Sequence, residues 1–163
     1  HTACRRQRQM CIRDRYDSVL WIFDRLVIAV ALGGTLVRIG NFFNSEIVGV
    51  FTNSDYGVIF QNRGEILPRH PAQLYEAFGY IILFITLVLI YNKTKLKDFK
   101  GFLFGFFLMF LFVVRFIVEY VKESQGGLEE QLGIFSTGQW LSIPFILIGI
   151  GLMIYSYILI EKK

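Results

Sequence analysis

Four apolar segments divide the sequence, and short polar segments separate them. The apolar segments run approximately over residues 21–36, 74–91, 101–121 and 140–160. A helix needs about 20 mostly apolar residues to cross the roughly 30 Å hydrocarbon core of a bilayer. The pattern therefore predicts an all-α integral membrane protein with about four transmembrane helices. The first segment is short and contains Asp24 and Arg25, so we expect it to need protein neighbours for stability.

The polar segment 42–73 predicts a short external loop region. A β-like run at residues 58–60 precedes the turn signal Asn62-Arg63-Gly64, which favours a small hairpin or an irregular loop. His70-Pro71 is typical of a helix start. Ser136 and Gln139 have capping-box spacing at the start of the last apolar segment. We expect one transmembrane domain over residues 16–163.

The distribution of charge predicts the topology. The connection 92–100 and the C-terminus are rich in lysine, and should be cytoplasmic by the positive-inside rule. The connections 42–73 and 122–138 carry mostly acidic charges and should face outward. The net charge of +4 therefore reflects membrane topology. We expect the bilayer as the surroundings of the chain and no nucleic-acid partner.

Residues 1–15 differ from the rest of the chain. They hold five arginines and both cysteines, Cys4 and Cys11, and have no hydrophobic periodicity. Their sequence resembles the translation of a sequencing adapter, so we expect a non-native or disordered tail. The cysteines have no disulfide or metal-ligand spacing. We expect neither a metal nor a cofactor.

Arg115 and Glu119 are the charged residues of the third apolar segment. Their spacing of four places them on one helix face, where they are expected to pair. A charge in contact with lipid costs about 2.5–3.5 kcal/mol at the bilayer centre, so both side chains should face protein or a wet cavity. A structural ion pair and a substrate site remain alternatives, and we favour the site.

A second polar cluster follows the first apolar segment. Arg38 and Asn41 share one helix face, and Asn44 and Glu46 follow as the helix leaves the membrane. Arg38 by itself would be expected to extend toward the interface. Arginine is the side chain best shaped to bind phosphate, so Arg38 and Arg115 together suggest an intramembrane anion site.

A third cluster lies in the segment His70-Pro71-Ala72-Gln73-Leu74-Tyr75-Glu76. His70 could act as a general base, as a phosphate ligand or as a polar helix cap. Glu76, in the first turns, suits the helix dipole. Neither a nucleophile elbow nor a phosphate-binding loop motif is present in the sequence.

Four motifs, in a fixed order along the chain, resemble those of a known protein family. They are R-I-G-N-F-F-N-S-E at 38–46, R-H-P-A-Q-L-Y-E at 69–76, R-F-I-V-E-Y at 115–120, and S-T-G-Q-W-L-S-I-P at 136–144. Over residues 17–160 the chain resembles the C-terminal half of prolipoprotein diacylglyceryl transferase. The full-length enzyme of that family has about seven spans. Asp24 falls where the family has an acidic residue. The resemblance implies that the chain is the C-terminal part of a larger polytopic enzyme.

The resemblance also implies an activity and roles for residues. The family acts in the bacterial inner membrane, where it transfers diacylglyceryl from phosphatidylglycerol to the lipobox cysteine thiol of a prolipoprotein. Arg38 and Arg115 would bind the phosphate, Glu119 would hold Arg115, and His70 is a candidate base. The expected catalytic residues are therefore Arg38, Arg115, His70 and Glu119. The expected substrate-binding residues are Arg38, Asn41, Asn44, Glu46, Gln73, Tyr75 and Glu76.

Two other functions fit the same pattern of charges. A transporter or channel would use Arg115 and Glu119 to line a solute path. A non-catalytic membrane assembly subunit would use the charges to hold its helices together. The enzyme hypothesis differs from both because it requires Arg38 and Arg115 to converge.

Overall fold

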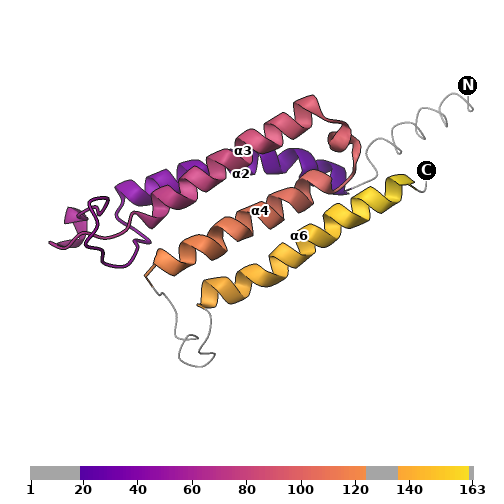
Figure 1. The fold of residues 1–163 in the computed structure, drawn as a ribbon. Coiled ribbons are helices and arrows are strands. Elements are labelled where there is room, and N and C mark those ends of the chain that lie inside the picture. The colour runs from indigo at the N-terminus through magenta and orange to yellow at the C-terminus, as the bar shows by residue number, and fades with distance from the viewer. Residues whose placement is uncertain (1–18, 124–135, 162–163) are drawn as a thin grey trace, which may run out of the picture.

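Helices account for nearly all regular structure in the chain, as Figure 1 shows for a computed structural model that describes residues 19–123 and 136–161. The long helices are α2 (Val19–Phe43), α3 (Ala72–Lys93), α4 (Phe102–Val118) and α6 (Thr137–Glu161). Four helices are long and apolar enough to cross a membrane, the third when residues up to Val121 are counted with α4. The all-α prediction with four spans is confirmed. The tail 1–15 lies outside the described residues, so the prediction for it is untested.

Helix α2 is longer than the apolar pattern predicted. It continues to Phe43, whereas the apolar segment ended near residue 36. The helix can continue because Arg38, in its last turns, pairs with Glu76 of α3. A paired charge between helices does not have to reach water, so it does not end the span.

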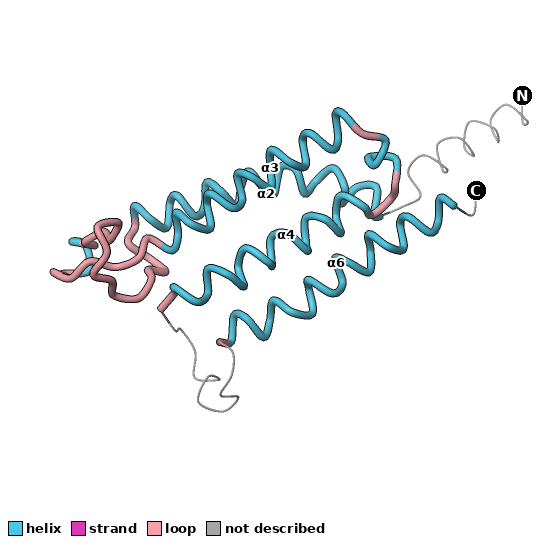
Figure 2. Tube along the Cα trace, in the orientation of Figure 1, coloured by secondary structure: helices cyan, strands magenta, loops and turns pink. Residues whose placement is uncertain are grey.

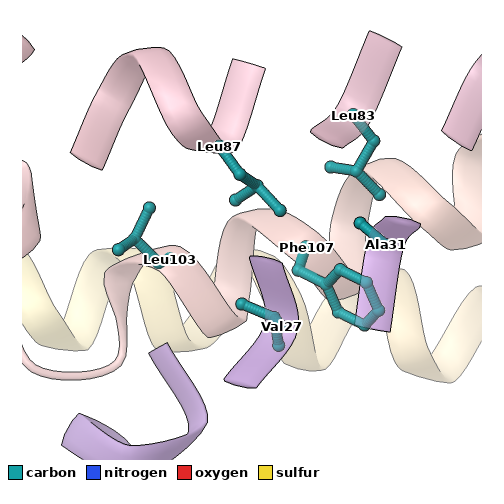
Figure 3. Close-up of a cluster of buried hydrophobic side chains, with 6 residues drawn as sticks. All are labelled: Val27, Ala31, Leu83, Leu87, Leu103 and Phe107. Carbon is teal, nitrogen blue, oxygen red and sulfur yellow. The ribbon is translucent and has the colours of Figure 1, made fainter. Parts of the chain in front are cut away.

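The helices pack in pairs. Helix α2 lies along α3, α6 lies along α4, and α4 also contacts α2 and α3 (Figure 1). Side chains from α2, α3 and α4 meet in one apolar cluster (Figure 3), whose buried members are Val27, Ala31, Leu83, Leu87, Leu103 and Phe107. Most other apolar side chains of the spans are exposed on the outside of the bundle, as expected for helices surrounded by lipid.

Glycines bring α4 and α6 close together. A Cβ added at Gly105 would lie 2.7 Å from the carbonyl oxygen of Gly149, and a Cβ at Gly149 would lie 2.7 Å from the carbonyl oxygen of Gly105. The two backbones therefore touch at this crossing. Small residues at such crossings allow the close packing that holds membrane helices together.

Asp24 explains how the first span tolerates a carboxylate. Its side chain is buried and accepts hydrogen bonds from the backbone N–H groups of Gly101, at 2.6 Å, and Phe104, at 2.8 Å. These N–H groups belong to the start of α4, where they lack partners within the helix. The first span thus has protein neighbours at its buried carboxylate, and its need for them stays a prediction.

The two ends of the bundle differ. The connection with the 3-10 turn η2 (Lys95–Asp98) joins α3 to α4 at one end, which we call the lysine end (Figure 2). The opposite end, called the loop end, carries the connection 44–71, the 3-10 turn η3 (Glu119–Val121) and the start of α6.

The loop 44–71 is irregular, with isolated antiparallel bridges and, within the described residues, no strand. Val58 bridges Arg69, so one contact of the predicted hairpin forms. The turn signal is confirmed as the 3-10 turn η1 (Gln61–Arg63), closed by Gly64 in the left-handed region.

Gly49 lies where three chain segments meet at the loop end. Its N–H donates to the carbonyl of His70, and the N–H of Val50 donates to the carbonyl of Val121, both at 2.9 Å. A Cβ at Gly49 would lie 2.6 Å from each of these carbonyl oxygens. The loop is therefore attached at one point to the start of α3 and to the end of η3.

Candidate functional site

A network of charged side chains connects the helices at the loop end. The Nε of Arg38 lies 2.7 Å from Oε2 of Glu76, and Nζ of Lys122 lies 4.0 Å from Oε1 of the same carboxylate. Lys122 Nζ also lies 3.7 Å from Oε2 of Glu119. The side chain of Glu76 is 2% exposed and that of Lys122 is 9% exposed. Opposite charges that are shielded from water in this way attract each other far more strongly than charges on the protein surface.

Tyr80 is near both arginines of the predicted anion site. It is one helical turn after Glu76 on α3 and is buried. The charges of Arg38 and Arg115 both act on its hydroxyl. Tyr80 also packs against Gly34 of α2, because a Cβ there would lie 3.4 Å from its ring. The structure thus brings Arg38 and Arg115 to a common neighbour.

The predicted pairing of Arg115 with Glu119 is wrong for this structure. Within residues 19–123 and 136–161, the ion-pair partner of Glu119 is Lys122. Helix α4 ends at Val118, and Glu119 begins the tighter turn η3. Its carboxylate occupies the space in which a Cβ of Gly138 would lie. Glu119 therefore points to the start of α6, where a negative charge is favoured by the helix dipole.

Gln73 fixes the loop that follows α2. Its side chain is fully buried, and its Nε2 donates to the backbone carbonyl of Glu46 at 2.6 Å. The neighbours of Glu46, Ser45 and Ile47, have φ values of 57° and 56°. Such left-handed conformations cost about 1–3 kcal/mol each in non-glycine residues and are common near functional sites. The Gln73 hydrogen bond helps to hold this strained segment against α3.

The two asparagines and the glutamate of the 38–46 motif differ in how far they are buried in the protein. Asn41 is half-buried, and its backbone carbonyl accepts from the N–H of Glu46 at 2.9 Å. The side chains of Asn44 and Glu46 are exposed. Glu46 thus contacts the site through its backbone carbonyl.

His70 and Tyr75 form a separate pair beside the network. The Nδ1 of His70 lies 3.4 Å from the hydroxyl of Tyr75, and Tyr75 is half-exposed. His70 is two residues before α3, the helix that carries Gln73 and Glu76.

Arg69 organises the loop region, a role that the sequence analysis missed. The guanidinium is buried, stacks on Phe51 with 3.7 Å between its carbon and the ring centre, and contacts Glu65 and Glu123. Burial by itself would lower the pKa of Arg69, but the hydrogen bonds and charges of Glu65 and Glu123 outweigh it and raise that pKa. Arg69 also donates to the carbonyl of Gly49 at 3.1 Å.

Lys122 and Tyr80 are further members of the site that sequence reasoning missed. Lys122 follows Glu119 by three residues, a spacing that permits contact between the two side chains. Its position in the connection 122–138 nevertheless suggests an ordinary loop lysine. Tyr80 lies one turn from Glu76 within an apolar segment. The hydroxyl of a tyrosine inside a span needs a hydrogen-bond partner, and this requirement could have indicated that Tyr80 belongs to a polar site.

The arrangement suits an anion with an apolar body. Three cations, Arg38, Arg115 and Lys122, gather near two carboxylates at one end of the bundle. An apolar cleft of about 220 Å³ lies between α4 and α6 and is lined by Phe116, Ile143, Ile146 and Leu147. The described residues contain no group of His, Cys, Asp and Glu able to hold a metal ion.

Comparisons with known proteins agree with the motifs. A family model described as prolipoprotein diacylglyceryl transferase matches residues 8–155. A relative from Tolumonas auensis named phosphatidylglycerol–prolipoprotein diacylglyceryl transferase is 50% identical over 140 residues, covering 86% of this chain and 53% of the relative. Relatives of the same name from Bacteroides fragilis and Chlamydia trachomatis are 40% and 38% identical, covering 82% and 83% of this chain and 48% and 50% of the relatives.

The chain thus spans about half the length of the curated relatives that it matches. No solved structure matches it.

Proposed function

Because the chain belongs to the prolipoprotein diacylglyceryl transferase family, we propose that it contributes the lipid-headgroup site of an enzyme that matures bacterial lipoproteins. The enzyme would transfer a diacylglyceryl group from phosphatidylglycerol to the lipobox cysteine of a prolipoprotein. The names of the relatives give the donor lipid and the acceptor. They do not favour the transporter and channel alternatives. The site would lie in the bacterial inner membrane, with the loop end facing outward.

One observation carries the proposal: the charges of Arg38 and Arg115 both act on the buried Tyr80 within the bundle. Glu76 anchors Arg38 through Nε, and the terminal nitrogens of Arg38 would bind the phosphate. Arginine binds phosphate through two parallel hydrogen bonds, and these are strong when water is excluded. The apolar cleft between α4 and α6 offers room for part of an acyl chain.

The reaction requires charge to be stabilised on a leaving phosphate. The cysteine sulfur attacks the glyceryl carbon that carries the phosphate ester, so that an S–C bond forms as the C–O bond breaks. The electron pair of the broken bond stays on the phosphate oxygen, and glycerol phosphate leaves. Arg38 and Arg115, already in place before the reaction, would stabilise that developing charge.

The thiol proton also needs an acceptor. A free thiol has a pKa of about 8.5, so most of it is protonated at neutral pH. His70 is the candidate base in this chain, because histidine is the commonest general base and His70 lies two residues before α3, the helix that carries Gln73 and Glu76. Tyr75 would orient the ring through the contact with Nδ1.

The test is a transfer assay with the full-length protein that contains this chain. Labelled phosphatidylglycerol and a lipobox peptide are incubated with the protein in lipid nanodiscs, and the labelled peptide is measured. Transfer supports the proposal. A peptide in which serine replaces the cysteine is the control for nonspecific labelling. Absence of transfer by a folded, membrane-inserted protein would overturn the proposal.

A further inference from the structure

Within the described part of the chain, two side-chain oxygen atoms of α3 are buried at the site without hydrogen-bond partners. They are Oε1 of Gln73 and Oε1 of Glu76. Gln73 is 0% exposed and Glu76 is 1% exposed, so bulk water does not reach them. A buried acceptor without a donor costs about 1–3 kcal/mol, and native proteins rarely leave one unfilled. Two such acceptors on one helix face therefore indicate a place for a hydrogen-bond donor.

The two side chains are fixed so that these oxygens remain free. Nε2 of Gln73 donates to the carbonyl of Glu46, which can only accept, so the amide orientation is determined. Oε2 of Glu76 pairs with Arg38. Lys122 lies 4.0 Å from Oε1 of Glu76, which is too long for a hydrogen bond. Residues three apart on a helix are neighbours, so Gln73 and Glu76 form one patch on a face of α3.

The charge around this patch selects the kind of donor. Among the residues that the structure describes around the patch, three cations, Arg38, Arg115 and Lys122, outnumber the two carboxylates, Glu76 and Glu119. A phosphate would neutralise the excess positive charge. A ligand that carries an ammonium group beside the phosphate would restore the excess positive charge. The surrounding cations would then repel the ammonium group, although Glu76 by itself attracts cations. A neutral hydroxyl donates a hydrogen bond without adding charge, so it fits both oxygens.

We propose that Gln73 and Glu76 bind the terminal hydroxyl groups of the glycerol headgroup, while Arg38 and Arg115 bind its phosphate. Phosphatidylglycerol has this combination of an anionic phosphate and neutral hydroxyl donors. The two residues then determine headgroup specificity. This inference rests on the proposed function, and it adds the contacts by which the donor lipid is distinguished from zwitterionic lipids.

The test varies the lipid and leaves the protein unaltered. The full-length protein is assayed with dioleoyl phosphatidylglycerol and with dioleoyl phosphatidylpropanol, which lacks both hydroxyls. Loss of hydrogen bonds to buried acceptors should lower kcat/KM for phosphatidylpropanol by about 10- to 100-fold. Equal use of the two lipids would overturn the inference and leave the proposed function standing. Transfer from neither lipid would overturn both.

Variants assign the effect to the residues. Gln73→Met removes the free acceptor together with the anchor to Glu46, so both transfer rates should fall, but the ratio of transfer from phosphatidylglycerol to transfer from phosphatidylpropanol should also fall about 10-fold. A merely structural role would lower both rates equally, because the loop anchor to Glu46 is lost for either lipid. Thr86→Val removes an exposed hydroxyl elsewhere on α3 and should leave the ratio unchanged. An unchanged ratio in Gln73→Met would overturn the role of Gln73.

Lys122 tests the electrostatic part of the argument. Lys122→Met removes one of the three cations, so discrimination against dioleoyl phosphatidylethanolamine should decrease. We expect the ratio of kcat/KM for phosphatidylglycerol to that for phosphatidylethanolamine to fall about 10-fold. A ratio equal to that of the unaltered protein would contradict the role of excess positive charge in headgroup selection.

Discussion

The Nε of Arg38, near the end of α2, lies 2.7 Å from the Oε2 of Glu76, in the second turn of α3. This ion pair connects the two helices at the loop end, and both side chains are largely buried. The predicted role of Arg38 therefore depends on a carboxylate that holds its guanidinium in place.

Glu76→Ala should destabilise the protein as well as inactivate it. The substitution leaves Arg38 and Lys122 buried near each other without their shared counterion. Breaking a buried pair by removing one partner costs about 3–5 kcal/mol. Thermal unfolding in detergent should show a clear decrease in Tm, and transfer should be lost. Asp55→Ala, at an exposed loop position, is the control. A Tm equal to that of the unaltered protein would contradict the structural role of Glu76.

Replacing Arg38 or Arg115 by lysine should lower turnover without unfolding the protein. Lysine keeps the positive charge but lacks the planar donor fork that binds phosphate at two points. Removal of one preorganised donor typically lowers kcat by about 100- to 1,000-fold, so we expect a loss of about 100-fold in each variant. Steady-state transfer kinetics measure it, and Lys95→Arg at the lysine end is the control. Full activity in both lysine variants would refute the assignment of Arg38 and Arg115 as phosphate-binding residues.

Gly138→Ala should affect activity more than stability. The new Cβ would occupy the position of the Glu119 carboxylate, the flexible end of a side chain that can move aside. Stability should then change by less than about 1 kcal/mol, because helices favour alanine over glycine. The displaced carboxylate loses Lys122, and turnover should fall about 10- to 100-fold.

Gly151→Ala is the matched control on the same helix, since its Cβ would meet nothing within 4 Å. Glu119→Asp combined with Gly138→Ala should restore part of the turnover, because the shorter side chain reduces the overlap. If Gly138→Ala keeps full turnover, the position of Glu119 has no influence on the reaction.

The fold was predictable because each of its main signals is local in sequence. A run of apolar residues determines a span by itself, and the four spans were found in this way. The capping box was also found from spacing. The N–H of Gln139 donates to Oγ of Ser136 at 3.2 Å, and the N–H of Ser136 donates to Oε1 of Gln139 at 3.1 Å.

The candidate site was harder to predict because its contacts join different helices. Spacing on one helix suggested that Glu119 pairs with Arg115, but a residue of another helix, Gly138, leaves space for its carboxylate elsewhere. Lys122 gave no signal distinct from that of an ordinary loop lysine. Sequence motifs indicated which segments carry the site, and packing between helices determines which of their side chains meet.

Asp24→Ala should weaken the bundle at the lysine end. The carboxylate is the acceptor for the N–H groups of Gly101 and Phe104, which would remain unpaired in an apolar environment. Loss of an N-terminal helix cap and of charged hydrogen bonds should cost about 2–3 kcal/mol. Asp24→Asn keeps an acceptor oxygen and should lose less. Thermal unfolding measures both, with the exposed Asp98→Ala as control. Equal Tm values for Asp24→Ala and Asp98→Ala would contradict the capping role.

Gly49→Ala should damage both the loop end and the reaction. A Cβ there would lie 2.6 Å from the carbonyl oxygens of His70 and Val121. These are backbone atoms, so the conflict can be relieved only by separating the chain segments that meet at Gly49. Overpacking typically costs about 1–3 kcal/mol, and we expect the upper part of that range.

The same separation would move the segments that carry His70 and Lys122, so turnover should fall by more than the loss of folded protein explains. Transfer normalised to the folded fraction measures this difference. Gly33→Ala is the control, because a Cβ at Gly33 meets nothing within 4 Å on α2. Normal Tm and turnover in Gly49→Ala would mean that the three segments need not touch, and that the loop does not position the residues of the site.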